Sequence, residues 1–207
     1  LFKSWQHTYR AHGCELPLEL WAANVGGYNY DVFDPLDWLE KEYGAPIDKE
    51  SVNAARRVCY LLQVNQQNAI CGAREAIAAV KATGVKLAVV SSSSRNWVPV
   101  HLKRLGLYDF FDVIVCGDEV ENVKPDPALY KLALDRLGIK AAHAFAVEDS
   151  PKGIAAARAA SLYCVAVPNP VTRASRLTGY NKMLDSLEEY PFNTIIAEIT
   201  AELFGNS

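Results

Sequence analysis

The sequence predicts an α/β protein in which a doubly wound parallel sheet follows an all-helical part. Residues 1–69 contain stretches of helical period and no strand signal, whereas residues from Gly72 onward alternate short apolar strands with amphipathic helices. Such alternation is typical of a parallel sheet covered by helices on both faces. Half of the 207 residues are hydrophobic, which is enough to build a sizeable core.

The elements follow in order along the chain. The helical part is expected from the segments 1–13, 18–26, 31–44 and 51–70. The later part should contain strands at 85–90, 111–116, 144–147 and 163–167, and helices at 73–83, 96–105, 127–137 and 153–160. Glycines close three of these helices, as is usual at helix ends. The change of pattern at Cys71 and Gly72 predicts a boundary between domains 1–70 and 71–207.

Charge and composition narrow the class of partner. The net charge is −3 and no block of like charges occurs, so neither nucleic acid nor an acidic membrane is expected as a partner. The five cysteines are widely spaced without a CxxC pair, which favours free thiols in a reducing compartment. No apolar run approaches the roughly 18 residues of a membrane span, and the first residues do not resemble a signal peptide. We therefore expect a cytoplasmic protein that acts on small molecules, and a monomer is favoured.

Polar clusters follow three of the expected strands, and the carboxyl ends of parallel strands are where such sheets bind ligands. The first cluster is "SSSSRN", Ser91 to Asn96, after the strand at 85–90. Hydroxyls and free backbone N–H groups before a helix can hold an oxyanion. The alternative is ordinary turn chemistry with Ser94 as the N-cap of the next helix.

The second cluster is "VKPDPALY", which places Lys124 just before a helix. Asp126 is a suitable N-cap and Pro127 a suitable first-turn residue, while Pro125 favours an extended backbone at Lys124. A lysine in this place is often only solvated. With its backbone restricted on both sides, however, Lys124 is suited to direct a positive charge at an anion.

The third cluster is "EDSPKG", where Glu148 and Asp149 adjoin at the end of a strand and Ser150 and Pro151 begin a helix. Adjacent carboxylates repel, so a partly buried pair needs a cation. Mg²⁺ takes oxygen ligands and keeps several waters, which suits this pair. The alternative is that both acids only stabilise the positive end of the helix dipole. Taken together, an anion loop, a lysine and an acid pair would face one crevice.

The three motifs, in this order, resemble the second, third and fourth motifs of the haloacid dehalogenase superfamily, in its phosphatase and β-phosphoglucomutase-like branch. The resemblance covers about residues 72–170, and the helical part resembles the small helical cap of that branch. It implies a doubly wound, Rossmann-like core beneath a small all-helical cap domain. It also implies a Mg²⁺-dependent phosphatase that acts on a small phosphorylated metabolite.

The resemblance also implies roles for individual residues. Ser92 matches the second-motif hydroxyl that holds the transferred phosphoryl group together with a backbone N–H, here that of Ser93. Lys124 matches the lysine that neutralises the phosphate and the nucleophile. Asp149 matches the magnesium ligand, with Glu148 beside it ordering the metal's water shell.

The neighbouring positions carry a further expectation. Asn96 matches a residue that reaches toward the substrate. Arg95 is near enough to Asn96 to touch a substrate, and the alternative is a solvated arginine. Leu1 falls where β-phosphoglucomutases have a cap histidine, and Asn29 about where they have a phosphate-clamping arginine. A mutase acting on a sugar phosphate is therefore not expected.

One motif of the family is not found. Its nucleophile is an aspartate in a strand reading like "DxDG", and that strand lies in the sheet between the strands that read here "VKLAVV" and "AFAV". We expect a segment of about 20 residues, as long as one strand and its loop, to lie before residue 1.

Without a carboxylate nucleophile no aspartyl-phosphate can form. The chain as printed is then expected to be inactive, with two unpaired strand edges. Direct pairing of the two flanking strands would contradict this expectation.

Two functions remain open from the sequence. The first is a Mg²⁺-dependent phosphatase whose nucleophile comes from the additional segment. The second is a catalytically inactive relative that keeps the anion and metal site as a binding or interaction module. The joint presence of Ser92, Lys124, Glu148 and Asp149 favours the enzyme.

Overall fold

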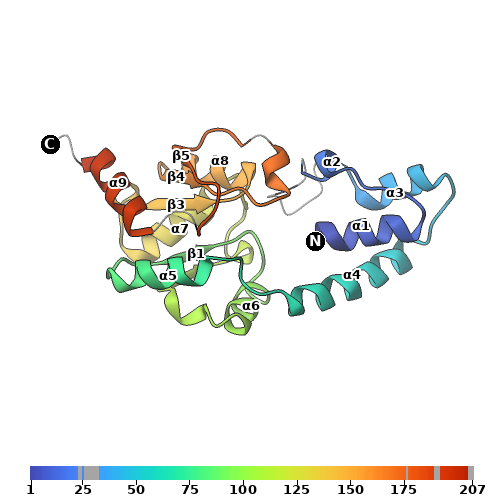
Figure 1. Ribbon diagram of the computed structural model, residues 1–207, viewed down its shortest axis with the longest axis horizontal. Helices are drawn as coiled ribbons and strands as arrows, with labels where there is room; N and C mark the ends of the chain where they lie inside the picture. The colour runs from blue at the N-terminus through green and yellow to red at the C-terminus, as the bar shows by residue number, and fades with distance from the viewer. Residues whose placement is uncertain (23–24, 26–32, 176, 189–191, 205–207) are drawn as a thin grey trace.

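The protein is described by a computed structural model of residues 1–207 (Figure 1). The structure describes residues 1–22, 25, 33–175, 177–188 and 192–204. Helices α1 to α4 gather on the right of the view, and the strands with their covering helices lie on the left. The helical first part of the chain and the second part with the strands are therefore also separate in space.

The helical unit, residues 1–66, has a core of its own. Its helices are α1 (Phe2–Ala11), α2 (Leu18–Ala22), α3 (Pro35–Tyr43) and α4 (Lys49–Gln66). The side chains buried together are those of Trp5, Tyr9, Leu16, Trp21 and Leu39. The hydroxyl of Tyr9 donates to the backbone oxygen of Pro35 at 2.6 Å, which gives this buried polar group a partner. Trp5 and Trp21 are thus packing residues.

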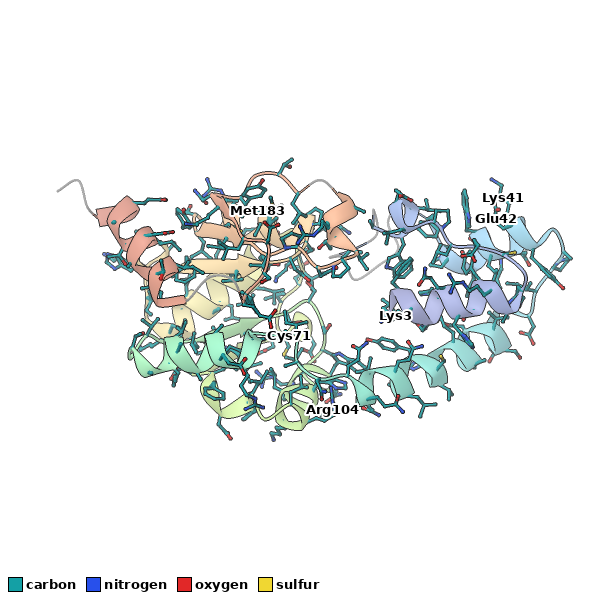
Figure 2. All side chains as sticks on the ribbon, viewed as in Figure 1. Lys3, Lys41, Glu42, Cys71, Arg104 and Met183 are labelled. Atoms are coloured by element: carbon teal, nitrogen blue, oxygen red, sulfur yellow. The ribbon has the colours of Figure 1, made fainter. Side chains whose placement is uncertain are left out.

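Helix α4 connects the helical unit to the rest of the chain. None of its residues, all of which the structure describes, is buried. Its end is fastened by Arg104, whose guanidinium donates to the backbone oxygens of Asn65 at 3.3 Å and Gln67 at 2.8 Å. Figure 2 shows Arg104 and Cys71 beside this connection. The backbone oxygens at the end of α4 are therefore paired with a cation, which is favourable at a helix C-terminus.

The second part alternates strands with helices. Its longer elements are α5 (Ala73–Ala82), β1 (Ala88–Val90), α6 (Val98–Arg104), β2 (Val113–Val115), α7 (Ala128–Leu137), β3 (Phe145–Glu148), α8 (Pro151–Ala159), β4 (Tyr163–Ala166), β5 (Lys182–Met183) and α9 (Phe192–Phe204). Short 3₁₀ turns are η1 (Tyr108–Phe110), η2 (Gly117–Glu119), η3 (Ala141–His143) and η4 (Thr172–Ser175). The strands and helices expected from residue 72 onward are confirmed, with ends shifted by at most three residues.

Strand β4 shows directly that both faces of the sheet are covered. Its side chains alternate: Cys164 and Ala166 pack in a cluster with α7 and α8, whereas Tyr163 and Val165 pack in a cluster with α9. A strand buried on both faces is the arrangement of doubly wound folds. The predicted α/β fold is therefore confirmed.

The strands of the described residues form two separate pieces. Strand β1 pairs with β2 in parallel, and β3, β4 and β5 form a second parallel piece in that order. Among the described residues β1 and β3 are not hydrogen-bonded to each other. The direct pairing that would have contradicted the expected intervening strand is therefore not observed.

An apolar cavity of about 470 Å³ lies between the two pieces. Residues of β1, including Ala88 and Val90, line it from one piece, and Phe145 to Val147 of β3 line it from the other. Helices α5, α7 and α9 contribute further apolar side chains. The facing edges of β1 and β3 thus enclose a space with apolar walls, which is the environment of a buried central strand.

None of the described helices is long and apolar enough to cross a membrane.

The cysteines provide a test of the packing. Cys71 is exposed, Cys116 and Cys164 are buried, and all five are unpaired. Burial and the negative charge of Glu148 raise the pKa of Cys164 to about 12. At pH 8 only about one Cys164 thiol in ten thousand would be the reactive thiolate.

We therefore expect iodoacetamide at pH 8 to modify Cys71 first and Cys164 last, as measured by peptide mass spectrometry over time. Addition of urea should remove the difference. Equal modification rates of Cys71 and Cys164 in the folded protein would contradict the packing of β4.

Candidate active site

The loop after β1 is held against the end of β2. The N–H of Ser91 donates to Val115 O at 3.0 Å, and the N–H of Gly117 donates to Ser93 O at 2.8 Å. A Cβ atom at Gly117 would lie 2.2 Å from the backbone oxygen of Ser92. Only glycine allows this close approach, so Gly117 fixes the position of the serine loop.

Ser92 carries the polar group of this loop that most needs a partner. Its Oγ is buried and has no hydrogen-bond partner among the described residues. A buried hydroxyl without a partner costs free energy, which a ligand oxygen would recover. The N–H of Ser93 donates to Ser91 Oγ at 3.1 Å, so a phosphate bound there would replace that hydroxyl as its acceptor.

The other residues of the loop differ in their contacts. Helix α6 begins at Val98 with Trp97 at the N-cap position, so the alternative of Ser94 as the helix cap is wrong. The guanidinium of Arg95 contacts Glu119 and the backbone oxygen of Ile114, both at 3.0 Å. These contacts favour a structural role for Arg95. Asn96 is exposed. A substrate contact by Arg95 or Asn96 stays a prediction.

Lys124 joins the two pieces of the sheet. Its Nζ donates to Val90 O, at the end of β1, at 2.9 Å and forms an ion pair with Glu148, at the end of β3. The two side chains are only 10% and 6% exposed. Lys124 and Pro125 lie in a turn that the N–H of Asp126 closes on Val123 O at 3.1 Å, and the Lys124–Pro125 peptide bond is cis. The N-cap of the next helix is Pro127 and not the expected Asp126, although Asp126 Oδ1 accepts from Ala128 N at 2.8 Å.

Glu148 is buried and closely surrounded by neighbouring groups. Its Oε1 accepts from Lys124 and from the hydroxyl of Tyr130, a residue of α7. Its Oε2 lies so close to Gly153 that a Cβ there would be 1.8 Å away. Part of the countercharge that the acid pair was expected to need is thus supplied by Lys124, in addition to any metal.

Asp149 has different surroundings from Glu148. It is exposed, and its Oδ2 accepts from Asn169 Nδ2 at 2.8 Å. The helix that follows begins as expected: Ser150 is the N-cap, its hydroxyl accepts from Gly153 N at 3.1 Å, and Pro151 is the first residue of α8. The expected N-cap and first-turn proline are therefore confirmed.

Tyr130 is a buried member of the site that the sequence did not reveal. Burial raises the pKa of its hydroxyl, and the negative charge of Glu148 and the hydrogen bond to it raise the pKa further. The hydroxyl therefore stays protonated and donates to Glu148 at any pH that the fold tolerates. The sequence carries a weak signal for the involvement of Tyr130, because this residue stands in "VKPDPALY" at the start of the helix after Lys124.

The donor set suits a hard cation. Asp149 and Glu148 carry carboxylate oxygens at the end of β3, and Ser92 carries an unpartnered hydroxyl in the loop after β1. The described residues contain no group of three or more His, Cys, Asp or Glu side chains that could enclose a metal. Mg²⁺ fits such a site, because it is commonly bound by one or two carboxylates with waters and phosphate oxygens in the other positions.

Two positions compared with mutase residues can now be placed. Leu1 precedes α1, where its side chain is half exposed. Asn29 lies outside the described residues. The expectation that the chain is not a mutase therefore stays a prediction.

The motifs and the fold agree with comparisons to known proteins. A model of the haloacid dehalogenase-like hydrolase family matches residues 35–167. The chain belongs to this family. YhcW of Bacillus subtilis, a protein named as a phosphatase, is 35% identical over 95% of this chain and 89% of its own length.

Two further relatives extend the comparison. A phosphorylated carbohydrates phosphatase of Thermotoga maritima is 42% identical over 44% of this chain and 42% of its own length. The crystal structure of a haloacid dehalogenase family hydrolase from Deinococcus radiodurans, with bound phosphate and sodium, matches 95% of this chain and 87% of its own chain, with 27% identity and a TM-score of 0.77. The family and the phosphatase-type fold are thus established together.

Gly153 provides a test of the site's packing. Alanine normally stabilises a helix by about 1 kcal/mol relative to glycine. In α8, however, its Cβ would collide with the carboxylate of Glu148, which Lys124 and Tyr130 hold in place. We expect Gly153→Ala to lower the free energy of unfolding by about 1 to 3 kcal/mol, the usual cost of overpacking, as measured by urea denaturation.

Ala155, an exposed residue of the same helix, offers a control. Ala155→Gly should cost only the helix propensity of about 1 kcal/mol. A Gly153→Ala protein that is more stable than the wild type would show that Glu148 does not occupy this space.

Proposed function

We propose that the protein is a Mg²⁺-dependent phosphatase that hydrolyses the phosphate monoester of a small metabolite. The observation that carries this proposal is the buried, unpaired hydroxyl of Ser92 at the end of β1. The ammonium group of Lys124 lies at the same strand end, on Val90 O. A hydrogen-bond donor and a positive charge at the carboxyl end of a parallel strand suit a phosphate group.

The residues of this chain would hold the phosphoryl group in the following way. Ser92 Oγ and the N–H of Ser93 would donate to its oxygens, and Lys124 would neutralise the charge that they carry in the transition state. Lys124 can do so from a fixed position, because Val90 O and Glu148 already hold its ammonium group. Asn96 and Arg95 remain candidates for contacts with the rest of the substrate.

Asp149, with Glu148 beside it, would hold the metal ion. When bound, Mg²⁺ supplies positive charge that polarises a phosphoryl oxygen and orients the reacting groups. Asp149 is the exposed member of the pair and is suited to direct coordination. Glu148, bound to Lys124 and Tyr130, is suited to keep the lysine side chain in place and to order the water around the metal.

The nucleophile is proposed to come from a strand in the cavity between β1 and β3. The carboxyl end of a strand there would lie between Val90 and Glu148, the two residues that Lys124 contacts. An aspartate at that end would attack the phosphorus atom in line with the ester oxygen. The P–O bond to the alcohol would break as the leaving oxygen takes a proton from solvent water. Water would then hydrolyse the aspartyl-phosphate, which releases inorganic phosphate and restores the aspartate.

The substrate class is proposed from the names of two relatives and from the presence of the helical unit. Two of the relatives are named as phosphatases, one of them acting on phosphorylated carbohydrates. We propose a small phosphorylated metabolite, with the helical unit acting as a cap domain over the site. A monomer in the cytoplasm remains our prediction, in keeping with the free cysteines.

Hydrolysis of p-nitrophenyl phosphate tests the metal assignment. In protein that includes the proposed strand, we expect Mg²⁺-dependent release of p-nitrophenol and a loss of at least about 100-fold in Asp149→Asn, since the metal contributes several kcal/mol to charge stabilisation. Asp37→Asn removes a carboxylate of the helical unit that is 70% exposed and should retain full activity. Full activity of Asp149→Asn would refute the metal assignment. Absence of turnover in every version of the protein would favour the inactive binding module.

The cavity generates a separate prediction. Residues 1–207 produced alone should bind the dye ANS strongly and hydrolyse no p-nitrophenyl phosphate above background, because apolar walls and two strand edges are left uncovered. Protein that includes the strand should bind little ANS. Mg²⁺-dependent turnover by residues 1–207 alone would show that the nucleophile lies within them.

A further inference from the structure

Asn169 lies just beyond β4, and its side chain reaches the neighbouring strand end. Its Nδ2 donates to Asp149 Oδ2 at 2.8 Å, although the two residues are 20 positions apart in the sequence. Strands β3 and β4 are paired in parallel, with Glu148 opposite Ala166. The parallel register therefore brings the residues that follow each strand to the same edge of the sheet.

The orientation of the Asn169 amide is determined by its other contacts. Oδ1 accepts from Val171 N at 2.8 Å and from Thr172 N at 3.0 Å. Because both partners are N–H donors, the atom that faces them must be the oxygen, and the NH₂ group must then face Asp149. The carboxylate accordingly receives a hydrogen bond from a donor whose direction is fixed.

The turn that holds Asn169 is firmly anchored. Thr172 is completely buried, and its Oγ1 accepts from Asn169 N at 3.0 Å. Val171 packs against the core of the helical unit, and η4 lies beside α2 (Figure 1). The turn that carries Asn169 is therefore fixed by its own hydrogen bonds and by the packing of Val171 against the helical unit.

We propose that Asn169 is a positioning residue for Asp149. Its NH₂ group fixes the rotation of the carboxylate, so that the oxygen not bound to Asn169 has a defined direction before a metal arrives. Partners of this kind typically change metal affinity 10- to 100-fold when they are removed. This inference rests on the proposed function, because it assigns Asp149 to the metal.

The required variant must remove the amide and leave the turn intact. Asn169→Ser does so, because a serine hydroxyl can accept from the backbone N–H two or three residues on but is too short to reach Asp149. Asn169→Asp also keeps both turn contacts and replaces the NH₂ group with an oxygen. Thr172→Val is the matched control, since it removes a hydroxyl from the same turn and retains the amide.

The test is Mn²⁺ binding measured by electron paramagnetic resonance, with thermal unfolding of each variant followed by circular dichroism. We expect wild-type protein to bind Mn²⁺, Asp149→Asn to lose binding, Asn169→Ser to bind about 10- to 100-fold more weakly, and Thr172→Val to bind within about twofold of wild type. Asn169→Asp should fold and show a changed Mn²⁺ spectrum.

Two kinds of result would overturn the inference. Wild-type affinity in Asn169→Ser together with an unchanged spectrum in Asn169→Asp would show that the amide does not act on the metal site. Equal weakening in Thr172→Val and Asn169→Ser would show that the turn matters and the amide does not. Wild-type affinity in Asp149→Asn is a different result, because it would refute the metal site of the proposed function itself.

Discussion

The buried ion pair of Lys124 and Glu148 is the interaction on which the rest of the site depends. It connects the end of β1 to the end of β3 across the space that separates the two pieces of the sheet. Removing water from both charges is costly, and loss of one partner from such a pair typically costs about 3 to 5 kcal/mol. Tyr130 and Val90 O reduce this cost by giving each charged group a second partner.

Two glycines make room for this arrangement. Gly117 lets the serine loop lie against the end of β2, and Gly153 lets the first turn of α8 lie against the Glu148 carboxylate. Because these two residues have no side chain, the backbone comes close to the site at both positions. What remains open among the described groups is the hydroxyl of Ser92 and the exposed carboxylate of Asp149, which are the two groups assigned to substrate and metal.

The sequence predicted the elements and their order well, because apolar periodicity and helix-end residues act locally. Ser150 and Pro151 begin α8 as expected, since capping depends on the next three residues only. Ser94 was wrong as a cap, because the chain after β1 is drawn to Gly117 and α6 starts only at Val98. The convergence of Lys124 with Glu148 followed from the rule for strand ends in parallel sheets.

Partners across the fold could not be predicted in the same way. Tyr130 is 18 residues from Glu148 and Asn169 is 20 residues from Asp149. Which side chains meet at such separations depends on strand register and helix packing, and periodicity does not specify either. The strand-end rule that singled out Glu148 and Asp149 would nevertheless have pointed to Asn169, had it been applied to β4 as well.

We propose that Ser92, Lys124 and Asp149 surround one phosphate position beside a metal ion. A crystal structure of the protein with Mg²⁺ and tungstate, an electron-dense phosphate mimic, tests it most directly. We expect tungstate within hydrogen-bond distance of Ser92 Oγ and Lys124 Nζ, and a metal coordinated by Asp149. Tungstate bound elsewhere, or a metal that does not contact Asp149, would contradict it.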